Sequence, residues 1–513
     1  ADNPYGEVVE CLGGTSVNDV EMISILVNQG LDYVFPDAVV REAEKVSTII
    51  DEQEIKERRD FRDITTFTID PHDAKDFDDA ISIKTLENGL LEIGVHIADV
   101  SHYVRPGTEM DEEAIKRSNS VYLVDRVVPM LPEQLSNLTC SLRPNEDKFT
   151  FSAVFNINSK NEVVSEWFGK TVIHSNKRFT YEEAQEIIEG KDDPLKMEIL
   201  KLDGIAKALR FERLEAGAMN IESEEVRFKL DDSGHPIDVI IKTSKDAHKL
   251  VEEFMLLANK RVAMFVSGPP EKPTKIPFVY RCHDKPDPEK LAAFSLFIEK
   301  FGLSVDLKNP ALISKNINGL LVSLREENEF SLIQSMAIRS MAKAVYETNN
   351  IGHYGLGFKE YTHFTSPIRR YADLLVHRIL LSKISSSRTI YGSELDELCK
   401  RISRMERKAV IAERESTKFF QTLFLSDKIG DTFEGTVSGL TEYGLFIKLN
   451  DNHCEGFVRL NEIPGDRFSF NKKTFSIIGN NRKEEINLGD PTTVKVSEVN
   501  PRKRQIELEI ISI

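Results

Sequence analysis

The sequence of 513 residues has few cysteines, no long apolar run and fewer basic than acidic residues. Its five cysteines are far apart and form no C-x-x-C pair, which argues against disulfides or a zinc site and favours reduced thiols in the cytoplasm. No stretch approaches the ~18 consecutive apolar residues of a membrane span. The first residues lack a basic-then-apolar signal layout, so we expect neither a secretory address nor a membrane partner.

The acidic excess, 84 Asp and Glu against 67 Lys and Arg, argues against a protein that coats nucleic acid with its whole surface. The charge is unevenly distributed, however, because residues 361–420 carry 12 Lys and Arg against 7 Asp and Glu. We therefore expect one local phosphate-binding surface. The acidic exterior would repel a polyanion elsewhere and so confine it to this surface.

The length predicts about three or four domains. Residues 1–50 predict a lone strand, Tyr5–Cys11, followed by a helical segment that leads into the next domain. Residues 51–390 alternate strands with long amphipathic helices, which is typical of a mixed α/β or α+β domain. The clearest of these elements are the strands Ile81–Lys84, Leu91–His96 and Phe149–Ile157 and the helices Tyr181–Glu189, Leu195–Ala216 and Asp246–Phe265.

The last part of the chain changes pattern twice. Residues 391–428 predict a long linking helix that starts at a capping box, Ser393-Glu394-Leu395-Asp396. Residues 429–513 contain five short strands, which predict a small barrel of the OB type. The predicted fold class is therefore α+β, with a large mixed α/β domain followed by a C-terminal five-stranded OB-fold barrel.

The segment Thr68–Ser82 concentrates acidic residues. It contains five aspartates within ten positions: Asp70, Asp73, Asp76, Asp78 and Asp79. Like charges this close repel, so the cluster is costly unless cations neutralise it. The flanking residues are β-prone, and Pro71 ends the first strand just after Asp70. We therefore expect the carboxylates on a bent loop between two strands.

Carboxylate oxygens are the ligands that Mg²⁺, Mn²⁺ and Ca²⁺ prefer. A calcium EF-hand counted from Asp70 needs glycine and glutamate where Lys75 and Ile81 stand, so that motif is excluded. Magnesium held by several aspartates is a usual device of phosphoryl chemistry, in which two ions clamp the attacking and leaving oxygens. The alternative interpretation is a solvated acidic loop without a ligand.

A second polar group lies in Tyr361–Arg378, YTHFTSPIRRYADLLVHR. Ser366 and Pro367 predict a helix start, with Ser366 at the N-cap. Arginines beside a helix N-terminus form an anion site, so Arg369 or Arg370 could bind a scissile phosphate. The alternative is that Arg370 simply pairs with Asp373 one turn away on the surface.

Three aromatic residues are candidates for base stacking. Tyr122 precedes a Pro-Met-Leu-Pro segment and either stacks on a base or belongs to the core. Tyr443 and Phe446 lie on the predicted second barrel strand, near Arg459 as a phosphate contact. Alternation along that strand favours one of the two barrel aromatics filling the core.

Together these motifs resemble the ribonuclease II and ribonuclease R family. The family signature is met by DP-x4-D-x-DDA from Asp70 to Ala80, HIADVSHYV, SVYL…VPMLP, HKLVEEFMLLAN, YRCHDKP and YTHFTSPIRRYADLLVHR, in the family's order. The terminal GTVSGLTEYGLFIKL…EGFVRL resembles the RNA-binding OB domain of the ribosomal protein S-one type. The tract before the barrel looks closer to bacterial ribonuclease R than to ribonuclease II.

The resemblance implies a processive 3′→5′ hydrolytic exoribonuclease that releases nucleoside 5′-monophosphates. Its substrate would be single-stranded RNA or RNA with a single-stranded 3′ overhang, including structured RNA. Residues 51–390 would be the catalytic RNB domain of a monomer that uses Mg²⁺ or Mn²⁺. No protein partner from a degradation machinery can be assigned.

The resemblance also assigns roles to residues. The catalytic, metal-binding aspartates are Asp70, Asp76, Asp78 and Asp79. The catalytic arginine is Arg369, and the base-stacking tyrosine is Tyr122. Arg370 is retained as an RNA contact, and a glutamate near the terminal nucleotide falls on Glu252 or Glu253, with Glu253 favoured. Asp73 matches no family ligand.

The sequence departs from the family at its start, where members carry two cold-shock barrels and only Tyr5–Cys11 resembles the end of the second. This difference bears on RNA capture and leaves the expected chemistry unchanged. Two other functions remain open. One is a catalytically silent RNA-binding scaffold of the same fold, and the other is a metal-dependent phosphatase or DNA nuclease.

Overall fold

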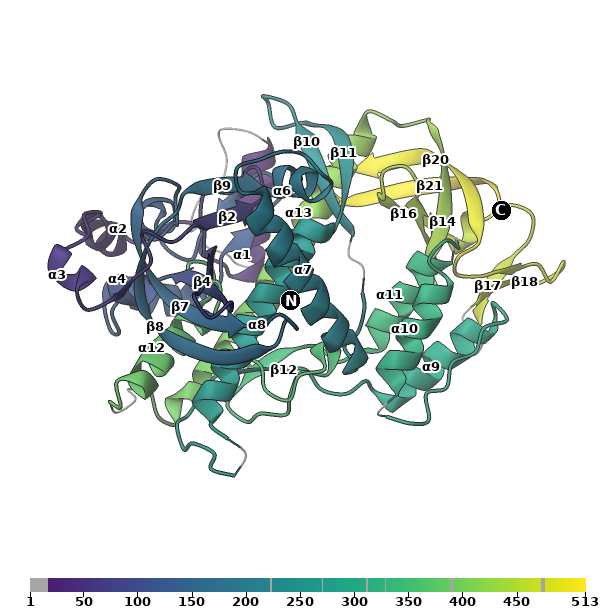
Figure 1. Cartoon of the computed structure of the whole chain (residues 1–513). Helices are drawn as coiled ribbons and strands as arrows, with labels where there is room; N and C mark the ends of the chain where they lie inside the picture. The colour runs from purple at the N-terminus through teal and green to yellow at the C-terminus, as the bar shows by residue number, and fades with distance from the viewer. Residues whose placement is uncertain are drawn as a thin grey trace.

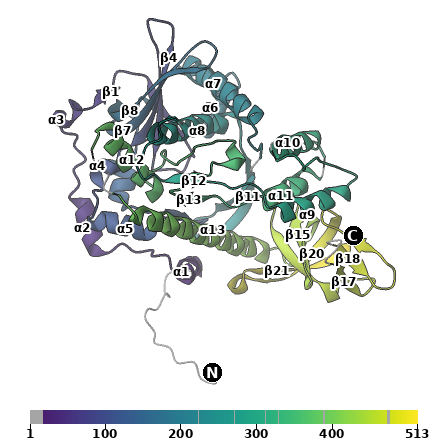
Figure 2. The same ribbon diagram turned by 90° about the horizontal axis from the view of Figure 1, so that it is seen from below.

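The computed structural model describes residues 17–221, 224–269, 271–310, 312–327, 329–387, 391–471 and 476–513. The predicted strand Tyr5–Cys11 lies outside these residues. A large α/β domain and a small barrel lie at opposite ends of the molecule (Figure 1). The long helix α13 (Glu394–Ser426) runs from one to the other, as Figure 2 shows from below.

A seven-stranded sheet forms the centre of the large domain, in the order β1-β8-β7-β4-β3-β2-β9. Its pairs are antiparallel except at the two edges, where β1 joins β8 and β9 joins β2 in parallel. The strands are β1 (Arg59–Asp60), β2 (Thr66–Asp70), β3 (Asp79–Thr85), β4 (Leu91–Ala98), β7 (Asp147–Ile157), β8 (Val163–His174) and β9 (Lys177–Thr180).

The central strands β4 and β7 are buried along most of their length on both faces. Continuous burial of this kind means that other elements cover both sides of the sheet. The helices α8 (Asp246–Ser267) and α12 (Tyr371–Ile384) belong to the same apolar core as the sheet. This core fixes the strand ends from which the acidic loop projects.

The remaining elements of the large domain surround this core. Its other helices are α1 (Val17–Gln29), α2 (Asp37–Glu44), α3 (Glu52–Ile55), α4 (Val100–Tyr103), α5 (Glu109–Arg117), the π-helix η1 (Gln134–Thr139), α6 (Tyr181–Ile188) and α7 (Lys196–Glu215). Its short strand pairs are β5 (Val121–Tyr122) with β6 (Val127–Val128), β10 (Glu224–Leu230) with β11 (Pro236–Thr243), and β12 (Tyr280–Cys282) with β13 (Val345–Glu347).

Three helices that the sequence analysis did not predict lie beside the barrel (Figure 1). They are α9 (Pro288–Glu299), α10 (Ile313–Ser323) and α11 (Phe330–Ser340). Their apolar side chains join the barrel's interior in one hydrophobic cluster. The barrel is therefore packed against the body of the molecule rather than attached only by α13.

The linking helix predicted over residues 391–428 corresponds to α13, but the capping box at its start is wrong. Ser393 already has helical dihedral angles and its side chain caps no backbone N–H. An N-cap residue must be non-helical for its side chain to reach the first turn. Instead, the Glu394 carboxylate accepts a hydrogen bond from the Gly392 N–H.

The C-terminal barrel is closed in the order β14-β15-β16-β21-β20. Its strands are β14 (Thr432–Leu440), β15 (Gly444–Leu449), β16 (Glu455–Arg459), β20 (Pro491–Asn500) and β21 (Gln505–Ser512). This confirms the predicted α+β fold with a five-stranded barrel. An additional small sheet, not predicted, inserts before β20 and consists of β17 (Phe468–Asn471), β18 (Ser476–Gly479) and β19 (Glu485–Ile486).

Two of the contacts between α13 and its neighbours bear on the site. Glu415 accepts a hydrogen bond from Arg504 of the barrel, with 2.9 Å between Nη1 and Oε2. Glu413 accepts one from the backbone N–H of Tyr122, at 3.1 Å.

No helix in the described ranges combines the length and apolarity needed to cross a bilayer.

Candidate active site

The acidic loop connects two neighbouring antiparallel strands, as the sequence predicts. Asp70 is the last residue of β2, and Asp79 is the first residue of β3. Residues 71–78 form the turn between them. Because the two strands pair side by side, Asp70 and Asp79 begin and end the loop at the same edge of the sheet.

Backbone hydrogen bonds fix the bend of this loop. The Ala98 N–H, at the end of β4, donates to the carbonyl of Asp78 at 2.9 Å. The Leu142 N–H donates to the carbonyl of Phe77 at 3.0 Å, and the Ser141 hydroxyl donates to the carbonyl of Lys75. The loop therefore has one defined backbone path, from which its carboxylates project.

Asp78 joins the two polar segments that the sequence analysis singled out. Its carboxylate is almost fully buried, and its Oδ1 accepts the Ile368 N–H at 2.9 Å. Its Oδ2 lies 3.6 Å from Nε of Arg369. The Arg369 guanidinium also donates to the Ser366 hydroxyl and remains partly exposed. The structure thus places Arg369 beside the acidic loop.

The four aspartates share an environment that disfavours their negative charge. Burial raises the pKa of Asp70 to about 7, and the nearby Asp79 carboxylate adds to this rise. Burial raises the pKa of Asp79 to about 6 against the opposing effect of Arg369. Burial also places the pKa of Asp76 above its ordinary value and that of Asp78 well above it. Burial therefore outweighs the opposing effect of Arg369 on Asp76, Asp78 and Asp79.

These residues fit a divalent cation by their chemistry. Within the described ranges, no three His, Cys, Asp or Glu side chains are already arranged so that they could hold a metal ion. The donors are nevertheless all carboxylates, and Asp70 Oδ2 is buried without a hydrogen-bond partner among the described residues. A cation would supply the partner that this oxygen lacks. The metal-binding assignment of the four aspartates stays a prediction.

Tyr122 lies at the edge of the acidic loop. Its hydroxyl is 3.5 Å from Oδ2 of Asp76, and its ring is 39% exposed. The neighbouring Val121 is buried, which is the alternation of a short strand. The structure therefore does not place Tyr122 in the core, and its ring is available to a ligand at the aspartates.

The helix start predicted at Ser366 and Pro367 is wrong. Residues 366–370 form a turn, closed by the Arg370 N–H on the carbonyl of Ser366, and α12 begins only at Tyr371. The physical reason is that Arg370 has extended dihedral angles and forms a bridge with Asn119. The next N–H, that of Tyr371, donates to the carbonyl of Ser118 rather than to this turn. The single turn at residues 366–370 therefore does not continue into α12.

Arg370 pairs with Asp373, but the pair is buried. Nε of Arg370 lies 2.8 Å from Oδ2 of Asp373, and Nη2 lies 2.9 Å from Oδ1. The Asp373 side chain is 0% exposed. The alternative interpretation, in which the two residues pair on the surface, is right about the pair and wrong about the surface, because the pair is buried. Both donors of Arg370 that face Asp373 are occupied, so this arginine is less available to RNA than Arg369.

The two adjacent glutamates of α8 have different environments. Glu253 is 2% exposed, and its carboxylate is held by the guanidinium of Arg213 from α7. Glu252 is more exposed and lies 2.8 Å from Nζ of Lys249. From the sequence, Glu253 was the favoured glutamate near the terminal nucleotide. Its burial does not support that prediction, because Glu252 is the more accessible carboxylate.

Tyr181, at the start of α6, is a site residue that the sequence analysis missed. Burial and the nearby Asp79 and Asp70 carboxylates raise its pKa. Its ring stacks on His248 with 4.1 Å between centroids. A Thr180–Glu183 capping box marks the helix start in the sequence. Its position beside Asp70, however, depends on the pairing of β9 with β2, which no local pattern reveals.

Neither barrel aromatic fills the core, so that alternative is wrong. The interior side chains of β15 are Leu445, Ile447 and Leu449. Phe446 faces outward and packs against Phe457, with ring centroids 5.0 Å apart. Tyr443 precedes the strand and is 73% exposed. The predicted alternation holds, but the strand starts at Gly444, so both aromatics lie outside.

These aromatics line a cavity of ≈ 530 Å³ between the barrel and α13. Lys418 of α13 and Lys503 also line it. Arg459 is not among the lining residues, and its guanidinium pairs with Glu507 at 3.1 Å. The exposed Tyr443 ring beside lysines suits a stacked base and a phosphate of a single strand, and Glu415, Glu455 and Glu507 belong to the same lining.

Comparison with known proteins identifies the families of the two domains. Residues 58–386 match the RNB domain family, and residues 426–511 match the S1 RNA binding domain family. The chain is 35% identical over 522 residues to Ribonuclease R 1 of Lactococcus lactis, covering 99% of this chain and 62% of that protein. It thus spans less than two thirds of that relative's length.

Two further proteins are similar over most of this chain. Ribonuclease R of Thermotoga maritima is 35% identical over 527 residues, covering 99% of this chain and 73% of that protein. The structure of Mycoplasma genitalium RNase R in complex with ribose methylated single-stranded RNA superposes with a TM-score of 0.90 at 28% identity. That match covers 98% of this chain and 79% of the other.

Proposed function

The chain belongs to the ribonuclease R family, and we propose that it degrades RNA hydrolytically and processively from the 3′ end. The products would be nucleoside 5′-monophosphates. The observation that carries this proposal is the meeting of Asp78 with Arg369 and Ile368, which brings a cationic side chain to a buried carboxylate loop. Carboxylates and an arginine at one point suit the hydrolysis of a phosphodiester.

Asp70, Asp76, Asp78 and Asp79 would hold Mg²⁺ or Mn²⁺. When bound, such ions activate a water molecule and stabilise the attacking and leaving oxygens. The protein's part is to present these carboxylates from a loop whose path is fixed by Ala98 and Leu142. The unpartnered oxygen of Asp70 supports this assignment.

Arg369 would neutralise the negative charge that develops on the phosphate oxygens. A preorganised donor of this kind typically contributes about 3–4 kcal/mol of transition-state stabilisation. Its guanidinium is held near the site by Asp78 and Ser366 and is partly exposed. Arg370 would act indirectly, because its pairing with Asp373 fixes the turn that carries Arg369.

The RNA would enter as a single strand with its 3′ end first. Tyr122 would stack on a base near the aspartates, and Tyr443 and Phe446 would stack on bases farther upstream. Stacking imposes little sequence selectivity because every base has a π-face. Glu252 would contact the terminal ribose, and a contact to the 2′-hydroxyl would exclude DNA.

The test is a time course on 5′-labelled RNA with a single-stranded 3′ end, with and without EDTA. We expect decay to a short core without a ladder of intermediates, release of mononucleotides, and complete arrest by the chelator. DNA of the same sequence serves as the substrate control. Equal cleavage of RNA and DNA would favour a DNA nuclease, and RNA binding without cleavage would favour a silent scaffold. Internal fragments would show an endonuclease and overturn the proposal.

A further inference from the structure

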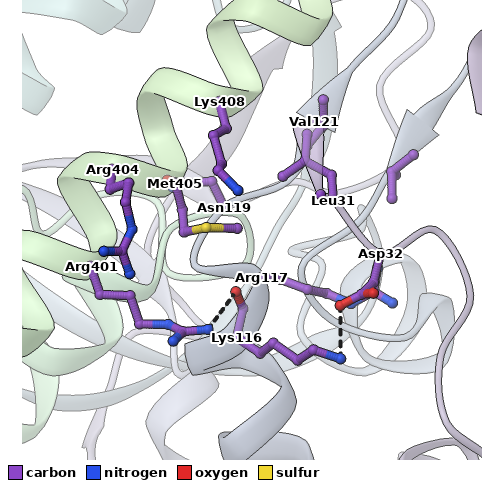
Figure 3. A pocket seen from close by; sticks show the side chains of 12 residues that line it. Leu31, Asp32, Lys116, Arg117, Asn119, Val121, Arg401, Arg404, Met405 and Lys408 are labelled. Carbon is purple, nitrogen blue, oxygen red and sulfur yellow. Dashed lines mark hydrogen bonds and ion pairs between the residues drawn. The ribbon is translucent and has the colours of Figure 1, made fainter. Parts of the chain in front are cut away.

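A second cavity, of ≈ 320 Å³, lies behind the short strand that carries Tyr122 (Figure 3). Val121 lines this cavity, whereas Tyr122 contacts the aspartate loop, because adjacent strand residues point to opposite faces. The other walls are the turn Gly30–Asp32, the end of α5 and the first half of α13. The cavity is therefore separate from the aspartate site.

The lining of this cavity is strongly basic in a chain whose net charge is −17. Its one acidic lining residue is Asp32, and its basic lining residues are Lys116, Arg117, Arg401, Arg404 and Lys408. Three of these cations already have protein partners. Lys116 pairs with Asp32 at 2.8 Å, Arg117 pairs with Glu113, and Arg401 donates to backbone carbonyls of α5. The dashed lines in Figure 3 mark the Lys116–Asp32 pair and the bond from Arg401 to Lys116.

Arg404 and Lys408 are different. Within the part of the chain that the structure describes, neither side chain has a hydrogen bond or an ion pair. They lie one turn apart on α13, where like charges repel each other. Figure 3 shows both extending from this helix beside Met405. A Cβ added to Gly30 would lie 3.3 Å from Nζ of Lys408, so this ammonium group lies against the opposite wall.

An independent observation comes from Asn119, which also lines the cavity. This residue is 9% exposed, and its Nδ2 has no hydrogen-bond partner among the described residues. A buried donor left without an acceptor is unfavourable. A rotation of the amide toward the cavity would allow a ligand oxygen to satisfy it.

We propose that this cavity binds a small phosphomonoester. The phosphate would be held by Arg404 and Lys408 and would accept a hydrogen bond from Asn119. The apolar part of the ligand would pack on Leu31, Val121, Val128 and Met405. The volume lies at the lower end of the range for small-molecule sites. Within this class we assign a nucleoside 5′-monophosphate, and this choice rests on the proposed function, whose product it is.

The experiment is calorimetric titration of the full chain with AMP, with inorganic phosphate and with adenosine, all in EDTA. EDTA removes the divalent ions through which the aspartates would attract a phosphate. The test variant is Arg404→Ala with Lys408→Ala, since neither side chain has a partner to lose. The matched control is Arg407→Ala, an exposed cation on the same helix that does not line the cavity. Circular dichroism checks that all variants are folded.

We expect AMP to bind the wild-type chain and the control with the same affinity within twofold. The double variant should bind AMP at least 10-fold more weakly, and adenosine should bind the wild type at least 10-fold more weakly than AMP does. Wild-type affinity in the double variant, or an equal loss in the control, would overturn the site. Inorganic phosphate binding as tightly as AMP would support an anion site and overturn its assignment to a nucleotide.

The same proteins are then assayed for RNA decay without added AMP. We expect the double variant to retain the wild-type rate within twofold. If the wild type fails to degrade RNA but the double variant still loses AMP binding, the proposed function falls and the cavity site stands. If RNA is degraded and AMP binding is unaffected by the double substitution, the proposed function stands and the cavity site falls.

Discussion

The Ile368 N–H donates a hydrogen bond to Oδ1 of Asp78 across a separation of 290 residues in the chain. This bond joins the acidic loop to the turn before α12 and places Arg369 next to the same carboxylate. The site thus depends on a contact between two distant segments.

Replacing Asp78 with asparagine is expected to abolish RNA turnover and to leave RNA binding intact. The substitution removes a charge and keeps the shape of the side chain, so turnover should fall by at least ~10²-fold. Rates from labelled RNA and affinities from filter binding measure the two effects. The control is Asp73→Asn in the same loop, whose side chain is 74% exposed and matches no family ligand. Wild-type turnover in the Asp78 variant would exclude the metal assignment.

Replacing Arg369 with alanine is expected to lower kcat by roughly 10²–10³-fold with little change in melting temperature. Arg370 cannot take over this role, because its guanidinium is bound to both oxygens of Asp373. Steady-state kinetics on a short RNA, combined with thermal melting, test the expectation. Arg369→Lys should recover part of the rate since it keeps the charge. A change confined to KM would indicate a role in binding only.

Replacing the adjacent Arg370 with alanine is expected to act mainly on stability. It leaves the fully buried Asp373 without its cation, which should cost about 3–5 kcal/mol in the free energy of unfolding. Urea denaturation measures this quantity. Removing Asp373 as well should recover part of the loss, because no buried charge then remains unpaired. A stable Arg370→Ala protein with lost activity would instead assign this arginine to the substrate.

The metal-free protein is expected to lose stability as the pH rises from about 5 to 8. Asp70 has a folded-state pKa of about 7, above its unfolded value of about 4. The folded state therefore binds more protons between these values, and unfolding becomes more favourable as they are released. Melting temperatures in EDTA across this range test the trend, and Mg²⁺ should reduce it.

Asp70→Asn is the control for this titration, because the amide carries no charge at any of these pH values. The slope of melting temperature against pH in EDTA should be smaller in this variant than in the wild type. Equal slopes in the two proteins would mean that other groups cause the pH dependence.

Tyr443→Ala is expected to weaken binding of long single-stranded RNA by roughly 5- to 100-fold, the value of one lost base stack. The side chain is 73% exposed, so stability should be unchanged. Fluorescence anisotropy with labelled poly(A) measures the affinity. Phe211→Ala on α7 is a matched control, since this ring is 67% exposed and far from the barrel in the sequence. Equal losses in both variants would remove the barrel from the binding path.

The elements that the sequence predicts well are those with local signals. Pro71 and the apolar runs on either side place Asp70 and Asp79 at strand ends, and the structure agrees. The Ser366–Pro367 helix signal fails because Arg370 is held extended by a tertiary bridge with Asn119. Tyr181 was missed for a related reason, since its place beside Asp70 follows from strand pairing.

The environment of single residues was harder to predict than their segments. Glu252 and Glu253 are neighbours in a helix, and only the packing of α7 shows that Arg213 hydrogen-bonds to Glu253 and lies 3.7 Å from Glu252. The alternation in β15 was correctly expected, but its register depends on where the strand begins. The helices α9–α11 were not predicted, and their apolar faces become meaningful only against the barrel.

The helix α13 sets a fixed span between two places that would touch the same RNA. Glu413 holds the backbone of Tyr122, and Glu415, two residues later, holds Arg504 of the barrel. The two glutamates are only ~3 Å apart along the helix axis, so one short stretch of α13 holds both elements and the stretch of RNA between barrel and tyrosine has a set length. The helix would then act as a molecular ruler, and RNAs too short to reach both ends would dissociate before the next cut.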